Sequence, residues 1–143
     1  MTEEVFRTRH SEIVEWYQYI EMHLKGICAA LAMDEDKSWF NSLDDFDSDP
    51  LGKLILKIKI LQEEKKINLF SDSDFDSLDA LRRSRNYWIH QCFSADHHVI
   101  FKRGIVRDVE FAKKINEDLR DAMDWEEKIV EKAREVIPKP PSI

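Results

Sequence analysis

The sequence has few of the residues that break regular structure. It contains only 3 glycines and 4 prolines in 143 residues, and three of those prolines lie near the C-terminal end, at Pro138, Pro140 and Pro141. An α/β fold needs more frequent turns than this composition provides. The sequence therefore predicts a few long elements, and its length predicts a single domain that can form a core without disulfides or metals.

Cysteines and long apolar runs are also scarce. The two cysteines, Cys28 and Cys92, lie in apolar helical patterns, which favours buried thiols in a reducing compartment. The most apolar run, 51–61, is interrupted by three lysines and cannot span a bilayer. The first residues show no apolar segment of the kind found in signal peptides. We therefore expect a cytoplasmic protein without a membrane partner.

Charge is unevenly distributed along the chain. The formal net charge of −7 argues against broad, nonspecific binding of nucleic acid. Residues 34–49 hold seven acidic residues and one lysine, whereas residues 82–107 hold six arginines and lysines, one aspartate and three of the five histidines. A basic segment that contains most of the histidines of an acidic protein indicates a local site for an anion.

Apolar residues recur at helical spacing in most of the chain. Steps of three and four residues predict four helices, over about 3–32, 50–64, 74–93 and 106–137. Asp49 is the expected N-cap of the second helix, with Pro50 as its first residue. A short extended piece is expected at 99–101. The pattern predicts an all-α, antiparallel up-and-down bundle of four to five helices over residues 1–137, followed by a disordered proline-rich tail, 138–143.

The acidic connection between the first two predicted helices has one alternative reading, as a calcium-binding loop. Asp45, Asp47 and Asp49 match the opening spacing of an EF-hand loop. The sixth position is Pro50 instead of glycine, however, and the twelfth is Leu56 instead of glutamate. The pattern therefore favours a solvated acidic loop.

The third predicted helix ends in a polar stretch. Arg85 continues the apolar line of this helix, which is an unusual place for an arginine without a partner or a function. Asn86 follows it directly, and His90 comes five residues after it. Five residues of an α-helix advance about 140° in azimuth and roughly 7.5 Å along the axis, so Arg85 and His90 are expected to flank the apolar stripe. A compact site would then be easier to build from two copies of the helix that face each other across a two-fold axis.

An arginine beside a histidine suits chemistry on a phosphodiester, and RNA in particular. His90 can take the proton of the ribose 2′-hydroxyl or supply one to the leaving oxygen. Arg85 can neutralise the charge that grows on the phosphoryl oxygens, without a metal or another cofactor. Asn86 can orient His90 or donate to a phosphate oxygen. Neighbouring side chains are predicted to contact the substrate, namely Arg82, Arg83 and Tyr87.

The stretch Arg85-Asn86-Tyr87-Trp88-Ile89-His90 resembles the R-x4-6-H motif of the HEPN superfamily, in which a polar residue often follows the arginine. The helical context is similar too, with the motif near the end of one helix and a long helix after it. The resemblance implies a helical bundle that forms a homodimer with both motifs in one cleft. It also implies a metal-independent ribonuclease, acting as the toxin of a toxin–antitoxin pair or as an antiviral effector.

The resemblance carries over Arg85, Asn86 and His90 only. One toxin branch is paired with a nucleotidyltransferase antitoxin that modifies a tyrosine two residues after the histidine. Here that position is Cys92, which puts such a modification in doubt, although Tyr87 lies within the motif. Other HEPN domains have lost activity, so the alternative is a silent helical module that binds a nucleotide or a protein partner.

Structural roles also account for these residues. Arg85 can pair with an acidic residue of another helix, and His90 can cap its own helix. The pair His97-His98 is closer to a solvated loop than to any zinc spacing. The large aromatic residues are expected in the core instead of forming a platform for bases, at Trp16, Tyr17 and Trp88. The acidic partners considered for Arg85 are Glu12, Glu15 and Asp118.

Overall fold

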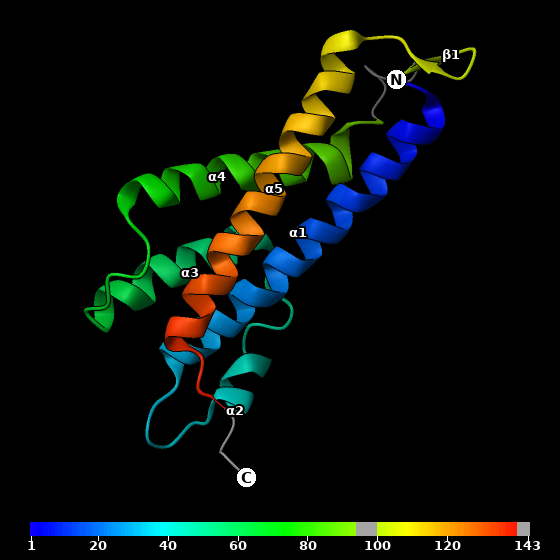
Figure 1. Ribbon diagram of the computed structural model, residues 1–143. Coiled ribbons are helices and arrows are strands. Elements are labelled where there is room, and N and C mark those ends of the chain that lie inside the picture. The colour runs from blue at the N-terminus through cyan, green and yellow to red at the C-terminus, as the bar shows by residue number, and fades with distance from the viewer. Residues whose placement is uncertain (94–99, 140–143) are drawn as a thin grey trace.

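A computed structural model describes residues 1–93 and 100–139 of the protein. The chain forms, in order, α1 (Glu3–Ala32), α2 (Trp39–Asp44), α3 (Leu51–Glu64), α4 (Asp72–Asn86), the π-helix η1 (Tyr87–Gln91), β1 (Phe101–Lys102), β2 (Ile105–Val106) and α5 (Val109–Val136) (Figure 1). The expected all-α helical bundle is confirmed. β1 and β2 form a two-stranded hairpin.

The two long helices, α1 and α5, lie side by side and run in the same direction (Figure 1). At their starts, the Glu3 amide donates to the Gly104 carbonyl at 2.7 Å, and Thr2 bridges to Ile105. At their ends, Gly26 of α1 lies against the side chain of Ile137. The alternation of an up-and-down bundle is therefore not kept between these two helices, because the chain returns to the start of α1 before α5 begins.

The hairpin that makes this return is closed by a tight turn. Phe101 pairs with Val106 and Lys102 with Ile105, so two residues form the loop. Both have positive φ, 54° at Arg103 and 75° at Gly104, as the turn preferred by two-residue hairpins requires. The hairpin takes up part of the extended piece expected at 99–101.

The core lies between α1 and the other helices. Tyr17 and Trp88 are fully buried and Trp16 is partly buried, which confirms their expected place in the core. Cys28 and Cys92 are unpaired and buried, also as expected. Within the described part of the chain, no helix is long and apolar enough to cross a membrane.

The start of α3 differs from the expectation. Its N-cap is Pro50, and Asp49 does not cap the helix. Instead the buried Asp49 carboxylate binds two lysines of α3, with Lys53 at 3.3 Å and Lys57 at 2.5 Å. The acidic connection before it contains α2, anchored where the Trp39 indole donates to the carbonyl of Gly26 at 3.0 Å. These two lysine partners satisfy the buried carboxylate.

Some expectations fall on residues outside the described ranges. These are the solvated loop at His97-His98, the start of the extended piece at Val99, and most of the expected disordered tail, at 140–143.

Candidate active site

The helix that carries Arg85 begins at Asp72, two residues before the predicted start near residue 74. Ser71 is the N-cap of α4: its hydroxyl accepts from the Asp74 amide at 3.1 Å, and the Asp74 carboxylate accepts from the Ser71 amide at 3.0 Å. This reciprocal pair is a capping box, which satisfies amides that a helix start leaves unbonded. Asp74 also binds Lys128 of α5. The start of α4 is therefore fixed both locally and against α5.

The other end of α4 departs from α-helical geometry. The amide of Cys92 donates to the carbonyl of Tyr87 at 2.8 Å, a bond that spans five residues instead of four. The carbonyl of Trp88, which an α-helix would offer to that amide, accepts instead from His10 Nε2 at 2.7 Å and from the Cys92 thiol at 3.1 Å. Such π-turns are rare and often lie at functional sites. Here His10 of α1 supplies the donor that stabilises the wider turn.

The π-turn brings the motif residues together within one chain. Arg85 Nη1 lies 3.5 Å from His90 Nε2 and donates to Asn86 Oδ1 at 3.2 Å. Arg85 Nε donates to Glu21 Oε1 of α1 at 3.0 Å, and both of these side chains are less than one-fifth exposed. His90 itself is exposed. The result is a surface cluster in which a held guanidinium faces an accessible imidazole.

This geometry corrects the expectation that Arg85 and His90 lie about 140° apart. That angle assumes an α-helix throughout, whereas bonds spanning five residues bring residues five apart onto one side. A second copy of the chain is therefore not needed to bring the two side chains into contact. The side-chain oxygen of Asn86 accepts a hydrogen bond from Arg85 Nη1 in this arrangement.

The other predicted substrate contacts lie elsewhere. Arg82 binds Asp79 at 2.9 Å, and Arg83 binds the same carboxylate at 3.4 Å. Arg82 also covers Gly52 of α3, where an added Cβ would lie 2.7 Å from Arg82 Cδ. Tyr87 packs against Trp88 and under the Lys114 ammonium of α5, which is 5.3 Å from its ring centroid. The structure thus joins Arg85, Asn86 and His90, and the described contacts of the other three are with different groups.

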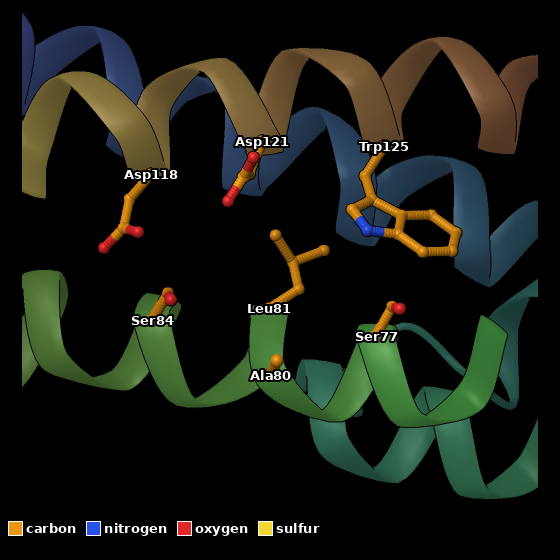
Figure 2. Close-up of a pocket in the computed structure, with 7 residues that line it drawn as sticks. All are labelled: Ser77, Ala80, Leu81, Ser84, Asp118, Asp121 and Trp125. Carbon is orange, nitrogen blue, oxygen red and sulfur yellow. The ribbon is translucent and has the colours of Figure 1, made fainter. Parts of the chain in front are cut away.

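A separate groove lies between α4 and α5 (Figure 2). Its volume is about 300 Å³, and the carboxylates of Asp118 and Asp121 reach it from α5, beside the Trp125 indole. Burial and the charge of Asp118 raise the pKa of Asp121, since both disfavour its anionic form. An anionic substrate would be repelled here. The residues that line it from α4 are Ser77, Ala80, Leu81 and Ser84.

Sequence reasoning missed two contributors, Glu21 and His10. The carboxylate that binds Arg85 is that of Glu21, and not one of the predicted Glu12, Glu15 and Asp118. The register between α1 and α4 decides which carboxylate reaches the guanidinium. His10 lies 78 residues from the carbonyl that it binds, so no local pattern indicates it. Burial raises the pKa of Cys92 to about 11, so this thiol is not a nucleophile near neutral pH. No cluster of metal-ligating side chains is found in the described ranges.

Comparison of the chain with protein-family models, with curated proteins and with solved structures gave no match. The assignment of a function therefore depends on the geometry of the Arg85 cluster and on the resemblance of its residues to the HEPN motif.

Proposed function

We propose that the protein is a metal-independent endoribonuclease of the HEPN type, which cleaves RNA at the cluster of Arg85, Asn86 and His90. The observation that carries the proposal is the 3.5 Å approach of Arg85 Nη1 to His90 Nε2. It places a permanent cation and a group that can transfer protons within the span of one phosphodiester.

The chemistry follows from what each side chain can do. His90 accepts the proton of a ribose 2′-hydroxyl, and the resulting oxygen attacks the adjacent phosphorus. Arg85 stabilises the negative charge that develops on the phosphoryl oxygens, through Nη atoms that Glu21 leaves available. The bond to the 5′-oxygen breaks, and that oxygen takes up a proton. The products are a 2′,3′-cyclic phosphate and a 5′-hydroxyl.

Partners and location belong to the same proposal. The HEPN resemblance favours a homodimer, and an antitoxin such as a nucleotidyltransferase-like protein, for a toxin or antiviral effector. The cytoplasm is the proposed compartment, because it contains the RNA and keeps thiols such as Cys28 and Cys92 reduced.

A second candidate is a catalytically silent module that binds a nucleotide or a protein. One observation favours it: the charge of Arg85 is already compensated by Glu21, as in a structural ion pair. A structural arginine, however, has no need of an accessible imidazole at its other end. We therefore place this candidate second.

Cleavage of RNA in EDTA tests the proposal. The purified protein is expected to release fragments with 2′,3′-cyclic phosphate ends, and Arg85→Ala and His90→Ala are expected to lower the rate at least ~10³-fold, as the loss of a principal catalytic group does. Light scattering establishes whether the dimer forms and persists in the variants.

Two exposed residues provide matched controls. Arg120→Ala removes an exposed arginine of α5 outside the Arg85 cluster, and Gln91→Ala removes an exposed side chain next to His90. Both are expected to cleave within ~3-fold of the parent, because surface substitutions away from a site have small effects. Equal cleavage by Arg85→Ala, His90→Ala and the parent would show that the site is elsewhere.

A further inference from the structure

Glu21 is the first member of a line of contacts that leads from α1 to His90. Its Oε1 accepts from Arg85 Nε at 3.0 Å, and Arg85 Nη1 lies 3.5 Å from His90 Nε2. The side chains of Glu21 and Arg85 are 18% and 19% exposed, so water screens their attraction only in part. Glu21 thus binds Nε of the guanidinium, while Nη1 of the same group lies towards His90.

The direction of the second contact determines where His90 carries its proton. A guanidinium has donors only, so a hydrogen bond between Arg85 Nη1 and His90 requires Nε2 to be the acceptor. Neutral His90 then carries its proton on Nδ1. In water the opposite form, with the proton on Nε2, predominates for an unconstrained histidine. The contact with Arg85 therefore selects the less common tautomer.

His10 shows the opposite arrangement within the same region. Its Nε2 lies 2.7 Å from the carbonyl oxygen of Trp88, which can only accept. His10 therefore carries its proton on Nε2. The two histidines that contact the end of α4 and η1 are expected in opposite tautomers, and one can serve as an internal reference for the other.

We propose that Glu21 is a positioning residue, which fixes the Arg85 guanidinium and through it sets the tautomer of His90. In the Nδ1–H form, the lone pair of Nε2 points to Arg85 Nη1, and it becomes the acceptor for a 2′-hydroxyl proton once the guanidinium turns its Nη hydrogens to a phosphate. This is the orientation that a general base needs. The expected tautomer of His90 does not depend on the proposed ribonuclease activity. The contribution of Glu21 to catalysis does rest on that proposed activity.

Substitutions of Glu21 distinguish the effect of the position of its side-chain oxygen from the effect of its negative charge. Glu21→Gln keeps an oxygen at the same reach but removes the charge, whereas Glu21→Asp keeps the charge but withdraws it by one methylene. Glu21→Ala removes both. Glu15→Ala is the matched control, because Glu15 also lies on α1, is exposed and contacts Tyr19. If Glu21 acts by position, the Gln variant should resemble the parent and the Asp variant should resemble the Ala variant.

The first measurement is the ¹⁵N spectrum of the imidazoles at a pH where the histidines are neutral. In the parent, Glu21→Gln and Glu15→Ala, His90 is expected as the Nδ1–H form. In Glu21→Ala and Glu21→Asp it is expected to shift towards Nε2–H, while His10 stays Nε2–H in every variant and reports that the fold is intact. A parent protein with His90 as Nε2–H overturns the proposal, as does a His90 tautomer that does not change in either shortened variant.

The second measurement is the rate of RNA cleavage. Glu21→Ala and Glu21→Asp are expected to lower kcat ~10–100-fold with KM within ~3-fold, since a small misplacement of a reacting group has an effect of this size. Glu21→Gln is expected within ~3-fold of the parent. If the parent does not cleave RNA and the tautomers still follow the expected series, the ribonuclease proposal fails and the positioning role stands. If the parent cleaves and kcat is unchanged in all three variants, the ribonuclease proposal stands and the catalytic benefit of Glu21 is overturned.

Discussion

The two ends of α4 are held in place in different ways. At its start, Ser71 and Asp74 bond to each other across three residues, and Lys128 adds one contact from α5. At its end, the partners come from α1: Glu21 binds Arg85 across 64 residues, and His10 binds the Trp88 carbonyl across 78. The first end is a local structure that the sequence alone can build, whereas the second exists only when α1 is docked.

This difference separates a structural end from the candidate site. Capping at the start of α4 uses the side chains of Ser71 and Asp74 to satisfy backbone amides. The wider turn at the other end exposes His90 while holding Arg85 beside it. Changes at the two ends should therefore have separable effects, on stability at the start and on chemistry at the end.

The largest expected effect is on cleavage. Arg85→Ala should lower the rate at least ~10³-fold, because it removes the charge that stabilises the transition state. Asp74→Asn, at the opposite end of the same helix, should stay within ~3-fold when both are assayed well below their melting temperatures. Rates on one RNA substrate, with circular dichroism to establish folding, make the comparison. A loss of similar size in Asp74→Asn would mean that the two ends are not separable.

Trp88→Phe tests the link between the core and the site. The buried indole donates to Asp118 Oδ2 at 2.8 Å. Its loss should lower the free energy of unfolding by about 2–3 kcal/mol, since the bond is to a charged group in a buried place. Urea unfolding measures this change. Trp125→Phe is the control, because Trp125 lines the groove on α5 and is only partly buried. An equal effect in both variants would contradict a special role for the Trp88 bond.

The contrast between the ends also explains what could be predicted from the sequence. The bounds of α1, α3 and α5 agree with the apolar spacing to within a few residues, because each buries one continuous stripe. The end of the third helix was predicted as α-helical, since residue spacing cannot show a donor such as His10 arriving from another helix. The same reason applies to Glu21, one of several carboxylates along α1, because only the packed register brings it to Arg85.

Asp49 is a smaller example of the same limit. Its place before Pro50 fits an N-cap, and the sequence contains nothing to rank this role against a pair of lysines one and two turns ahead. The structure shows the lysine contacts because Asp49 is buried, where a carboxylate needs charged partners. Local rules therefore predicted the residue's importance but assigned it the wrong partner.

Loss of the cap at the start of α4 should have a moderate effect. Ser71→Ala removes the hydroxyl that accepts from the Asp74 amide and should lower the free energy of unfolding by about 1 kcal/mol. That corresponds to a fall in Tm of about 2–4 °C for a chain of this size. Calorimetry measures the change, and Ser77→Ala, at an exposed position within α4, is the control. Unchanged RNA cleavage below the Tm is expected in both, and impaired cleavage would argue that the start of α4 also shapes the site.

The smallest expected effect depends on pH. The Asp74 carboxylate accepts hydrogen bonds from Lys128 and from Ser71. These bonds hold the pKa of Asp74 below its ordinary value. The folded state then favours the ionised carboxylate more than the unfolded state does, so the stabilisation is present above the unfolded pKa of about 3.9 and is lost as pH falls through the lower folded value. Asp74→Asn should therefore lower Tm at pH 7, and the difference from the parent should shrink as the pH falls below about 4. Lys128→Met should show the same decrease in the difference with acid. A difference that persists undiminished at pH 2 would mean that Asp74 acts through packing and capping geometry, and not through its charge.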